Sequence, residues 1–237
     1  MAPSYTARER GGAAVAAGTR NTGAGGGGRR NLKIAFEGVI GVGKTTLAQA
    51  LAEELGAVRL FEDEIHNPYL KSFYKHRSRY ALPCQLYFLE ARLAQFARNL
   101  PYGVPVVADH SMIKERLFAD VNLEGEDRAL YFRLHERLAS QAGFTPEVVV
   151  YLSAPLDEVK QRIRARGRRM ENTIDVGYLH ALIEAYHQWF AEVEDRLERV
   201  VVINADGAGL ANDRGAVARL ADACAAARPG IQYCNPR

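Results

Sequence analysis

The chain has 237 residues, of which 48% are hydrophobic and 25% are charged, and its formal net charge is +3. This length and composition suit one large globular domain with a substantial core. The positive charge comes from residues 1–31, where five arginines stand against one acid, so the remaining residues carry about −1 and a nucleic-acid-binding body is disfavoured.

Residues 1–31 consist largely of glycine, alanine and arginine, with few large apolar side chains. Such a segment cannot bury enough surface to offset the entropy cost of ordering, so we expect a disordered tail before one domain over residues 32–237. The arginines and the scarcity of acids leave an organellar transit peptide open, although the glycine run at 23–28 forms no amphipathic face.

The three cysteines, an odd and sparse count, show neither metal-binding nor redox spacing, which indicates a reducing compartment. No apolar run is long enough to cross a bilayer. These features favour a cytoplasmic protein that binds neither membrane nor nucleic acid.

Short apolar runs alternate with helical patterns after residue 31. Strands are predicted at 33–37, 58–62, 104–109, 147–152 and 200–204. Helices are predicted at 45–55, 82–100, 126–141, 156–166, 176–196 and 214–227. Strands that alternate with helices are typically parallel with right-handed crossovers, so the prediction is an α/β fold in which helices flank a five-stranded parallel sheet.

A glycine-rich segment lies between the first predicted strand and the first predicted helix. Its glycines let backbone N–H groups converge on an anion, and the helix N-terminus adds positive charge at the same place. Lys44 can reach the β- and γ-phosphates of a nucleotide, and the Thr45 hydroxyl can hold Mg²⁺. The alternative is a glycine-rich turn with an exposed lysine. The residues expected to bind the nucleotide are Gly38, Gly41, Val42, Gly43, Lys44, Thr45 and Thr46.

Acidic residues follow two other strands, at the edge where open parallel sheets bind ligands. Glu62, with Asp63 and Glu64 behind it, can accept the proton of an attacking hydroxyl, an effect worth about 10²–10⁴ in rate. Asp109 can hold Mg²⁺ together with Thr45. The alternatives are a solvated acidic turn for Glu62 and a helix N-cap for Asp109, a role for which Ser111 competes.

Five arginines crowd into residues 162–169 around Gly167. Arg162 and Arg166 lie one turn apart on a helix and share a face. Such a cluster at a helix end suits a lid that closes on phosphates and neutralises transition-state charge. A solvated basic surface or an RNA-binding patch is the alternative, although no aromatic residues are interleaved there.

Gln85 and Arg92 lie seven residues apart, on one face of the predicted second helix. A glutamine amide donates and accepts hydrogen bonds side by side, so Gln85 can pair with the edge of a nucleobase. The alternative for Gln85 is an ordinary surface residue.

These motifs together resemble the deoxynucleoside kinases, the family of the deoxycytidine, deoxyguanosine and deoxyadenosine kinases, and most of all its bacterial purine-specific members. The likeness runs from about Leu32 to Asn204. It includes Asn67-Pro68-Tyr69 after Glu62, and Phe73-Tyr74 ahead of Gln85. The resemblance implies a three-layer P-loop kinase fold with an arginine-rich lid over about residues 162–172.

The resemblance also implies roles for the acceptor site. Glu62 matches the general base on the sugar 5′-hydroxyl, while Tyr74 and Glu171 match residues that contact the 3′-hydroxyl. Gln85 matches the residue that hydrogen-bonds the base. Arg92 matches an arginine of the base site that pairs with a downstream acid, here Glu115.

On the donor side, the resemblance places Arg162, Arg166 and Arg168 in the lid over the phosphates. The loop Asn204-Ala205-Asp206-Gly207 occupies the position that usually contacts the donor base, so Asp206 is a candidate for that contact. Lys44, Arg166 and Arg168 are therefore expected to act with Glu62 in catalysis.

The sequence departs from the family at Asp109-His110-Ser111. Many relatives have an acid, an arginine and a serine there, and the arginine contacts the 5′-oxygen and the phosphate. His110 is mostly neutral near pH 7 and cannot supply a guanidinium fork. Lys114, four residues further on, is expected to provide the missing charge.

The predicted function is transfer of the γ-phosphoryl group of ATP, or another nucleoside triphosphate, with Mg²⁺, to the 5′-hydroxyl of a deoxynucleoside. A purine deoxynucleoside is the first expectation, followed by deoxycytidine and thymidine. The family likeness also suggests a homodimer through the helices near 82–100 and 126–141. The alternatives are a nucleoside monophosphate kinase, such as a thymidylate kinase, and a non-catalytic ATP-binding switch or assembly subunit.

Overall fold

The computed structural model describes residues 31–62, 66–97, 100–139, 143–168, 171, 174–193, 198–205 and 209–236. The predicted tail lies outside these residues, apart from Asn31, and so do the predicted Asp63, Glu64 and Asp206. Among the described residues, no helix combines the length and the apolar character that a membrane span needs.

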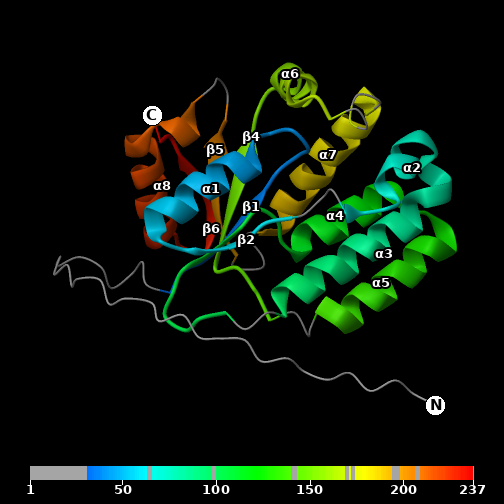
Figure 1. Ribbon diagram of the computed structural model, residues 1–237, viewed down its shortest axis with the longest axis horizontal. Coiled ribbons are helices and arrows are strands. Elements are labelled where there is room, and N and C mark those ends of the chain that lie inside the picture. Colours follow the sequence, from blue (N-terminus) through cyan, green and yellow to red (C-terminus); the bar gives the residue numbers. More distant parts are fainter. Residues whose placement is uncertain are drawn as a thin grey trace, which may run out of the picture.

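A single six-stranded sheet forms the centre of the described fold, in the order β2-β3-β1-β4-β5-β6, and every neighbouring pair is parallel (Figure 1). The strands are β1 (Lys33–Glu37), β2 (Val58–Leu60), β3 (Val106–Ala108), β4 (Val148–Ser153), β5 (Arg199–Asn204) and β6 (Gly230–Cys234).

The predicted five-stranded sheet is wrong by one strand. All five predicted strands form, and β6 pairs with β5 at the edge. The burial pattern of β6 explains the omission, because none of its five residues is fully buried and Tyr233 is 84% exposed. An edge strand of this kind lacks the continuous apolar run that marks the central strands.

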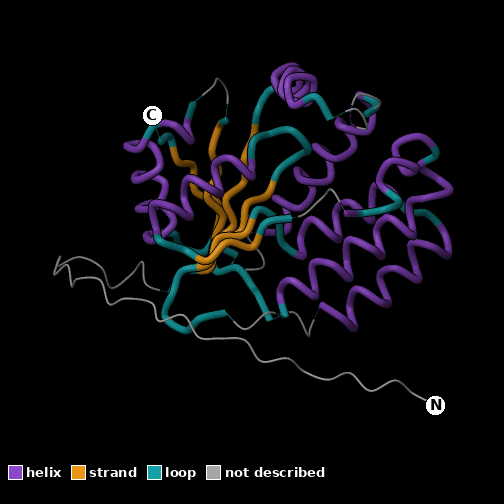
Figure 2. Tube along the Cα trace, viewed as in Figure 1, coloured by secondary structure: helices purple, strands orange, loops and turns teal. Residues whose placement is uncertain are grey.

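The helices cover both faces of the sheet. They are α1 (Lys44–Leu55), α2 (Leu70–Lys75), α3 (Arg77–Phe96), α4 (Met112–Asn122), α5 (Gly125–Ala139), α6 (Leu156–Arg166), α7 (Val176–Val193) and α8 (Arg214–Ala226). Figures 1 and 2 show α1 and α8 on one face and α4 and α7 on the other, with α3, α5 and α2 further out. The three-layer α/β prediction is therefore confirmed.

Two helices were not predicted, and a third begins earlier than predicted. The short α2 has only six residues. The helix α4 buries Lys114 and Glu115 together with its apolar residues, so charged side chains interrupt its apolar pattern. The helix α3 starts at Arg77 and continues through Pro83, a residue that normally marks a helix start.

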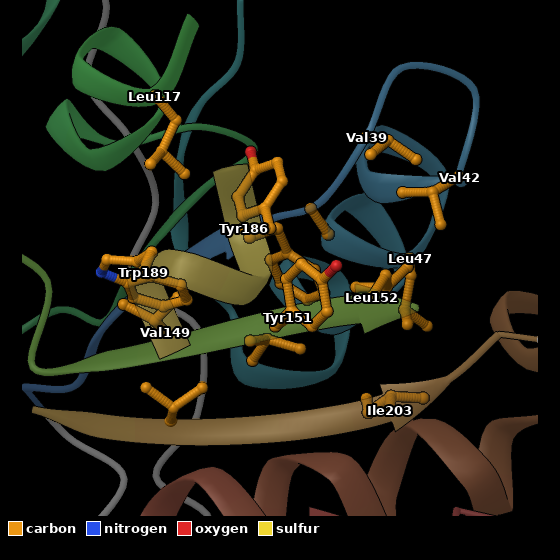
Figure 3. Close-up of a cluster of buried hydrophobic side chains, with 14 of the residues drawn as sticks. Val39, Val42, Leu47, Leu117, Val149, Tyr151, Leu152, Tyr186, Trp189 and Ile203 are labelled. Atoms are coloured by element: carbon orange, nitrogen blue, oxygen red, sulfur yellow. The ribbon is translucent and has the colours of Figure 1, made fainter. Parts of the chain in front are cut away.

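On the α7 side of the sheet, aromatic side chains of the core contact residues near the ends of the strands. Figure 3 shows Tyr186 between Trp189 and Tyr151 of β4. The Tyr186 ring centroid lies 5.2 Å from that of Tyr151 and 6.4 Å from that of Trp189. The Tyr186 hydroxyl donates to Glu37 Oε2 at 2.7 Å. The other oxygen of this fully buried carboxylate accepts hydrogen bonds from the Ser111 amide and hydroxyl at 2.9 and 2.6 Å. Glu37 thereby joins the end of β1 to α7 and to the start of α4.

Gly38 follows β1 in a conformation that excludes a side chain. Its φ is 140°, and a Cβ added there would lie 2.6 Å from the Leu152 carbonyl oxygen. A residue with a side chain would have to strain the backbone and displace β4.

We predict that Gly38→Ala lowers the free energy of unfolding by about 2–4 kcal/mol, because left-handed strain and the clash with β4 add. Gly56→Ala is the matched control, since Gly56 has φ 60° and no heavy atom within 4 Å of an added Cβ. The control should cost about 1 kcal/mol. Urea unfolding measures both variants, and equal losses would show that the contact with Leu152 imposes no constraint.

Candidate active site

The phosphate loop curls at the carboxyl end of β1, ahead of α1. Gly38, Gly41 and Gly43 all have positive φ, at 140°, 81° and 105°. The Lys44 ammonium group donates to the carbonyl oxygens of Gly38 and Val39 at 2.7 and 2.9 Å. The ammonium group therefore lies within the loop, and the N-terminus of α1 opens at the same place. This is the geometry that binds phosphates.

One cavity of about 610 Å³ connects this loop to the helices on the other side of the sheet. At the loop end it is lined by residues 40–47 and by Ala205, Gly209, Leu210 and Ala211. At the far end it is lined by Leu70, Phe73, Tyr74, Cys84, Gln85, Phe88, Arg92, Phe118, Asn122 and Tyr178. Its volume lies in the range of sites that enclose small organic ligands.

Asp109, which follows β3 and lines the cavity, connects its own segment to Thr45 of α1 and to Glu62 after β2. Its Oδ2 accepts a hydrogen bond from the Thr45 hydroxyl at 2.7 Å, and its Oδ1 accepts one from the Glu62 amide at 2.8 Å. Burial would raise the pKa of Asp109, but hydrogen bonds from His110 and Thr45 and the charge of Lys114 bring it below its ordinary value. The alternative of an N-cap is wrong for Asp109, because Ser111 caps α4 by accepting from the Ile113 amide at 3.1 Å.

The Thr45 hydroxyl and the Asp109 carboxylate are in contact and both line the cavity. They are hard oxygen ligands, as Mg²⁺ prefers. No group of three or more histidine, cysteine or acidic residues able to hold a metal occurs within the described part of the chain. This donor set fits an ion that takes one or two protein ligands and completes its coordination with phosphates and water.

Glu62 lies between two cations at the middle of the cavity. Lys114 Nζ donates to Glu62 Oε2 at 2.6 Å, and the Arg92 guanidinium donates to Oε1. The Glu62 side chain is only 6% exposed, and the residue lines the cavity. Two cationic partners favour the ionised carboxylate and hold its orientation.

The Arg92 guanidinium also pairs with Glu115, which accepts a hydrogen bond from the Tyr131 hydroxyl. Burial lowers the pKa of Arg92 from its ordinary value to about 10, which still leaves it charged at neutral pH. Neither Glu115 nor Tyr131 lines the cavity, so both act behind Arg92. Tyr131 was not predicted from the sequence, and its only signal was an aromatic residue within the helix near 126–141.

Gln85 presents a buried amide to the far end of the cavity. The residue is 4% exposed, lines the cavity and makes no side-chain hydrogen bond to the described residues. Phe88 and Phe118 line the cavity with it, and the Arg92 guanidinium carbon lies 4.7 Å from the Phe88 ring centroid. A buried amide among apolar walls is suited to a flat, polar-edged ligand.

Tyr74 of α2 and Glu171 of the lid segment line the same cavity. Glu171 is 3% exposed, and its Oε1 lies 3.2 Å from Arg168 Nη1 and 3.8 Å from Arg166 Nη1. Arg166 lines the cavity, whereas Arg168 does not. Two of the three predicted lid arginines, Arg166 and Arg168, therefore lie against the acid that was expected to contact a sugar.

Arg162 holds α6 against the phosphate loop. Its guanidinium donates to the Val42 carbonyl at 2.9 Å, to Glu158 at 2.9 Å and to the Ala205 carbonyl. Arg162 also lines the cavity. The structure thus brings Arg162 to the nucleotide end of the site and shows a scaffolding role that the sequence did not reveal.

His110 is fully buried and lies outside the cavity lining. Its Nδ1 is 3.0 Å from Asp109 Oδ1, and its ring stacks on Phe96 with centroids 5.1 Å apart. Burial lowers the pKa of His110 from 6.5 to about 4, so the ring is neutral at physiological pH. It is not a cation facing the ligand, whereas Lys114 lines the cavity.

The sequence matches the deoxynucleoside kinase family over residues 34–226. The chain belongs to the deoxynucleoside kinase family. It is therefore a phosphotransferase that acts on a deoxynucleoside.

Individual relatives agree with this assignment. The kinase is 32% identical to deoxyguanosine kinase of Bacillus subtilis, over 73% of this chain and 86% of the relative. It is 31% identical to deoxyadenosine kinase of Dictyostelium discoideum, over 72% of this chain and 71% of the relative. The structure of deoxyadenosine kinase from M. mycoides with bound dCTP shares the fold, with a TM-score of 0.67 and 24% identity over 75% of this chain and 92% of that chain.

The charge network around Arg92 yields a stability prediction. Arg92→Met should lower the free energy of unfolding of the kinase by about 3–5 kcal/mol, because Glu62 and Glu115 lose their shared cation in a buried site. Arg116→Met is the control, because the Arg116 side chain is 44% exposed and its ion pair with Glu192 is loose, with 3.8 Å between the charged atoms. Its cost should stay within about 1 kcal/mol in urea unfolding. Similar costs for both variants would contradict the network.

Proposed function

We propose that this kinase transfers the γ-phosphoryl group of ATP, or another nucleoside triphosphate, to the 5′-hydroxyl of a purine deoxynucleoside, giving the 5′-monophosphate. The observation that carries the proposal is the single cavity that joins the phosphate loop, the Glu62 carboxylate and the Gln85 amide. Purine deoxynucleosides come first because the relatives include a deoxyguanosine kinase and a deoxyadenosine kinase.

The donor binds with its phosphates at the loop end. Backbone N–H groups of the loop, the N-terminus of α1 and the Lys44 ammonium hold the β- and γ-phosphates. Thr45 and Asp109 would hold Mg²⁺, which would neutralise charge on the phosphates. Arg162 lines the cavity at the loop end, where the donor binds. Asp206, the candidate for the contact with the donor base, is outside the described residues.

The acceptor binds with its 5′-hydroxyl at Glu62. The carboxylate takes the hydroxyl proton while the oxygen attacks the γ-phosphorus, and Arg92 holds the carboxylate in place. The bond between the γ-phosphorus and the bridging oxygen breaks, and the nucleoside diphosphate leaves. Lys114 donates to the same carboxylate and lines the cavity. When Glu62 takes the proton and becomes neutral, the charge of Lys114 becomes available to the transferred phosphoryl group. Phosphoryl transfer requires little covalent chemistry from the protein. Most of the catalysis therefore comes from positioning the reactants and from stabilising the charge of the transition state.

The sugar and base occupy the far end of the cavity. Tyr74 and Glu171 bind the 3′-hydroxyl from two sides, and Gln85 pairs with the base edge between Phe88 and Phe118. Lid closure moves Arg166 and Arg168 from Glu171 to the phosphates, so the same movement frees Glu171 for the sugar.

The proposal extends to a cytoplasmic homodimer. Of the 15 residues of α5, only Tyr131 is buried, whereas Leu130 is 38% exposed and Leu138 is 36% exposed. Exposed apolar residues on a helix that packs against α3 support a subunit interface formed by these two helices.

A monophosphate kinase fits less well. Its acceptor carries a phosphate that needs unneutralised cations, whereas the cations beside the acceptor end, Arg92 and Lys114, both pair with Glu62. Like charges of the acceptor phosphate and Glu62 would also repel.

The function is tested by measuring monophosphate formation from the four deoxynucleosides with ATP and Mg²⁺. We expect deoxyguanosine or deoxyadenosine to give the highest kcat/KM. In Glu62→Gln, kcat should fall by about 10²–10⁴ because the proton acceptor is lost. Glu90→Gln, at an exposed position of α3, should leave kcat unchanged. Turnover of the Glu62→Gln variant within threefold of wild type, or activity with monophosphates only, would overturn the proposal.

Base recognition is tested by Gln85→Leu. This change should raise the KM for every deoxynucleoside by about 10–100-fold, because polar groups of the base are buried without a partner. The KM for ATP should stay the same. Gln188→Leu, exposed on α7, is the control. A raised KM for ATP with an unchanged KM for the deoxynucleoside would place Gln85 on the donor side instead.

A further inference from the structure

His110 is next to Asp109 in the chain, yet the structure places it outside the cavity lining. We infer that His110 is a positioning residue that holds the Asp109 carboxylate in the orientation that serves Thr45 and the Glu62 segment. The inference rests on the proposed function, because it assigns His110 to the same reaction.

The hydrogen bond between the two side chains has a defined direction. His110 Nδ1 lies 3.0 Å from Asp109 Oδ1. An ionised carboxylate only accepts hydrogen bonds, so a hydrogen must be on Nδ1. The ring therefore acts as a donor towards Asp109.

The ring itself has little freedom to turn. It is fully buried and stacks on Phe96 with ring centroids 5.1 Å apart and an interplanar angle of 18°. Phe96 is held in turn by Phe144, at 5.1 Å between centroids. Because packing against Phe96 holds the ring, its Nδ1–H group can hold the Asp109 carboxylate in one orientation.

The Asp109 carboxylate has both oxygens in use. Oδ1 accepts from His110 and from the Glu62 amide, and Oδ2 accepts from the Thr45 hydroxyl. Without His110, Oδ1 keeps one donor and the carboxylate can rotate away from Thr45. The same rotation would release the backbone of Glu62, the proposed proton acceptor.

Only one edge of the ring takes part. Within the described residues, His110 Nε2 is buried and has no hydrogen-bond partner. A phenylalanine would therefore preserve the packing and lose only the useful donor. An asparagine would keep the donor, because its amide N–H₂ group occupies the place of Nδ1. It would lose the packing, because the rest of the ring is missing.

This contrast allows function and stability to be separated. In His110→Phe, we expect kcat for the best deoxynucleoside to fall by about 10–100-fold, as for other residues that orient a metal ligand. The affinity for ATP with Mg²⁺, measured by calorimetry, should weaken while the affinity for ATP without Mg²⁺ stays the same. The thermal midpoint should remain close to that of the wild type. In His110→Asn, the thermal midpoint should fall, and kcat should recover to within fivefold of the wild type.

Three outcomes would overturn the inference. The first is a His110→Phe variant with kcat within threefold of wild type. The second is a loss of kcat that parallels the loss of thermal midpoint in both variants, which would indicate a purely structural residue. The third is a ¹⁵N NMR spectrum of the wild type in which His110 carries its hydrogen on Nε2. The NMR measurement decides the matter if the phenylalanine variant fails to fold.

The wild-type protein separates this inference from the proposed function. If the wild type phosphorylates no deoxynucleoside, the proposed function fails. If it does and the His110 variants behave otherwise than expected, only the positioning role fails.

Discussion

Three buried carboxylates at one edge of the sheet govern the architecture of this kinase. Glu37 ends β1, Glu62 follows β2 and Asp109 follows β3. Because these strands are neighbours and parallel, their acids are brought to the same end of the sheet, where each needs hydrogen-bond or charge partners. The partners come from different parts of the chain, so satisfying the acids also determines how α1, α3, α4 and α7 are placed.

The partners differ according to what each acid does. Glu37 has neutral donors, the Ser111 amide and hydroxyl and the Tyr186 hydroxyl, and it connects helices to the sheet. Glu62 has two cations and faces the cavity. Such buried ion pairs add little net stability, because desolvation offsets the attraction. Their value here is geometric, since they fix one carboxylate beside the ligand.

Several features of the site follow directly from local sequence. The phosphate loop, Glu62, Asp109 and the arginines of α6 were predicted because each carries chemistry that depends on residue type and close spacing. The central strands were predicted because strands covered on both faces are apolar throughout. The helix α4 and the strand β6 were not, because buried charges in one and partial exposure of the other hide their periodicity.

The sequence by itself determined that the chain binds a nucleotide on a parallel α/β sheet and which side chains are available for catalysis. The family resemblance indicated that Arg92 pairs with Glu115, and the structure confirms this contact. Only the tertiary structure decided the other pairs: Arg92 also contacts Glu62, Lys114 contacts Glu62, and His110 turns inwards to Asp109. The physical reason is that partners such as Glu62 and Arg92 lie 30 positions apart. Their contact depends on strand order and helix packing, which no local pattern encodes.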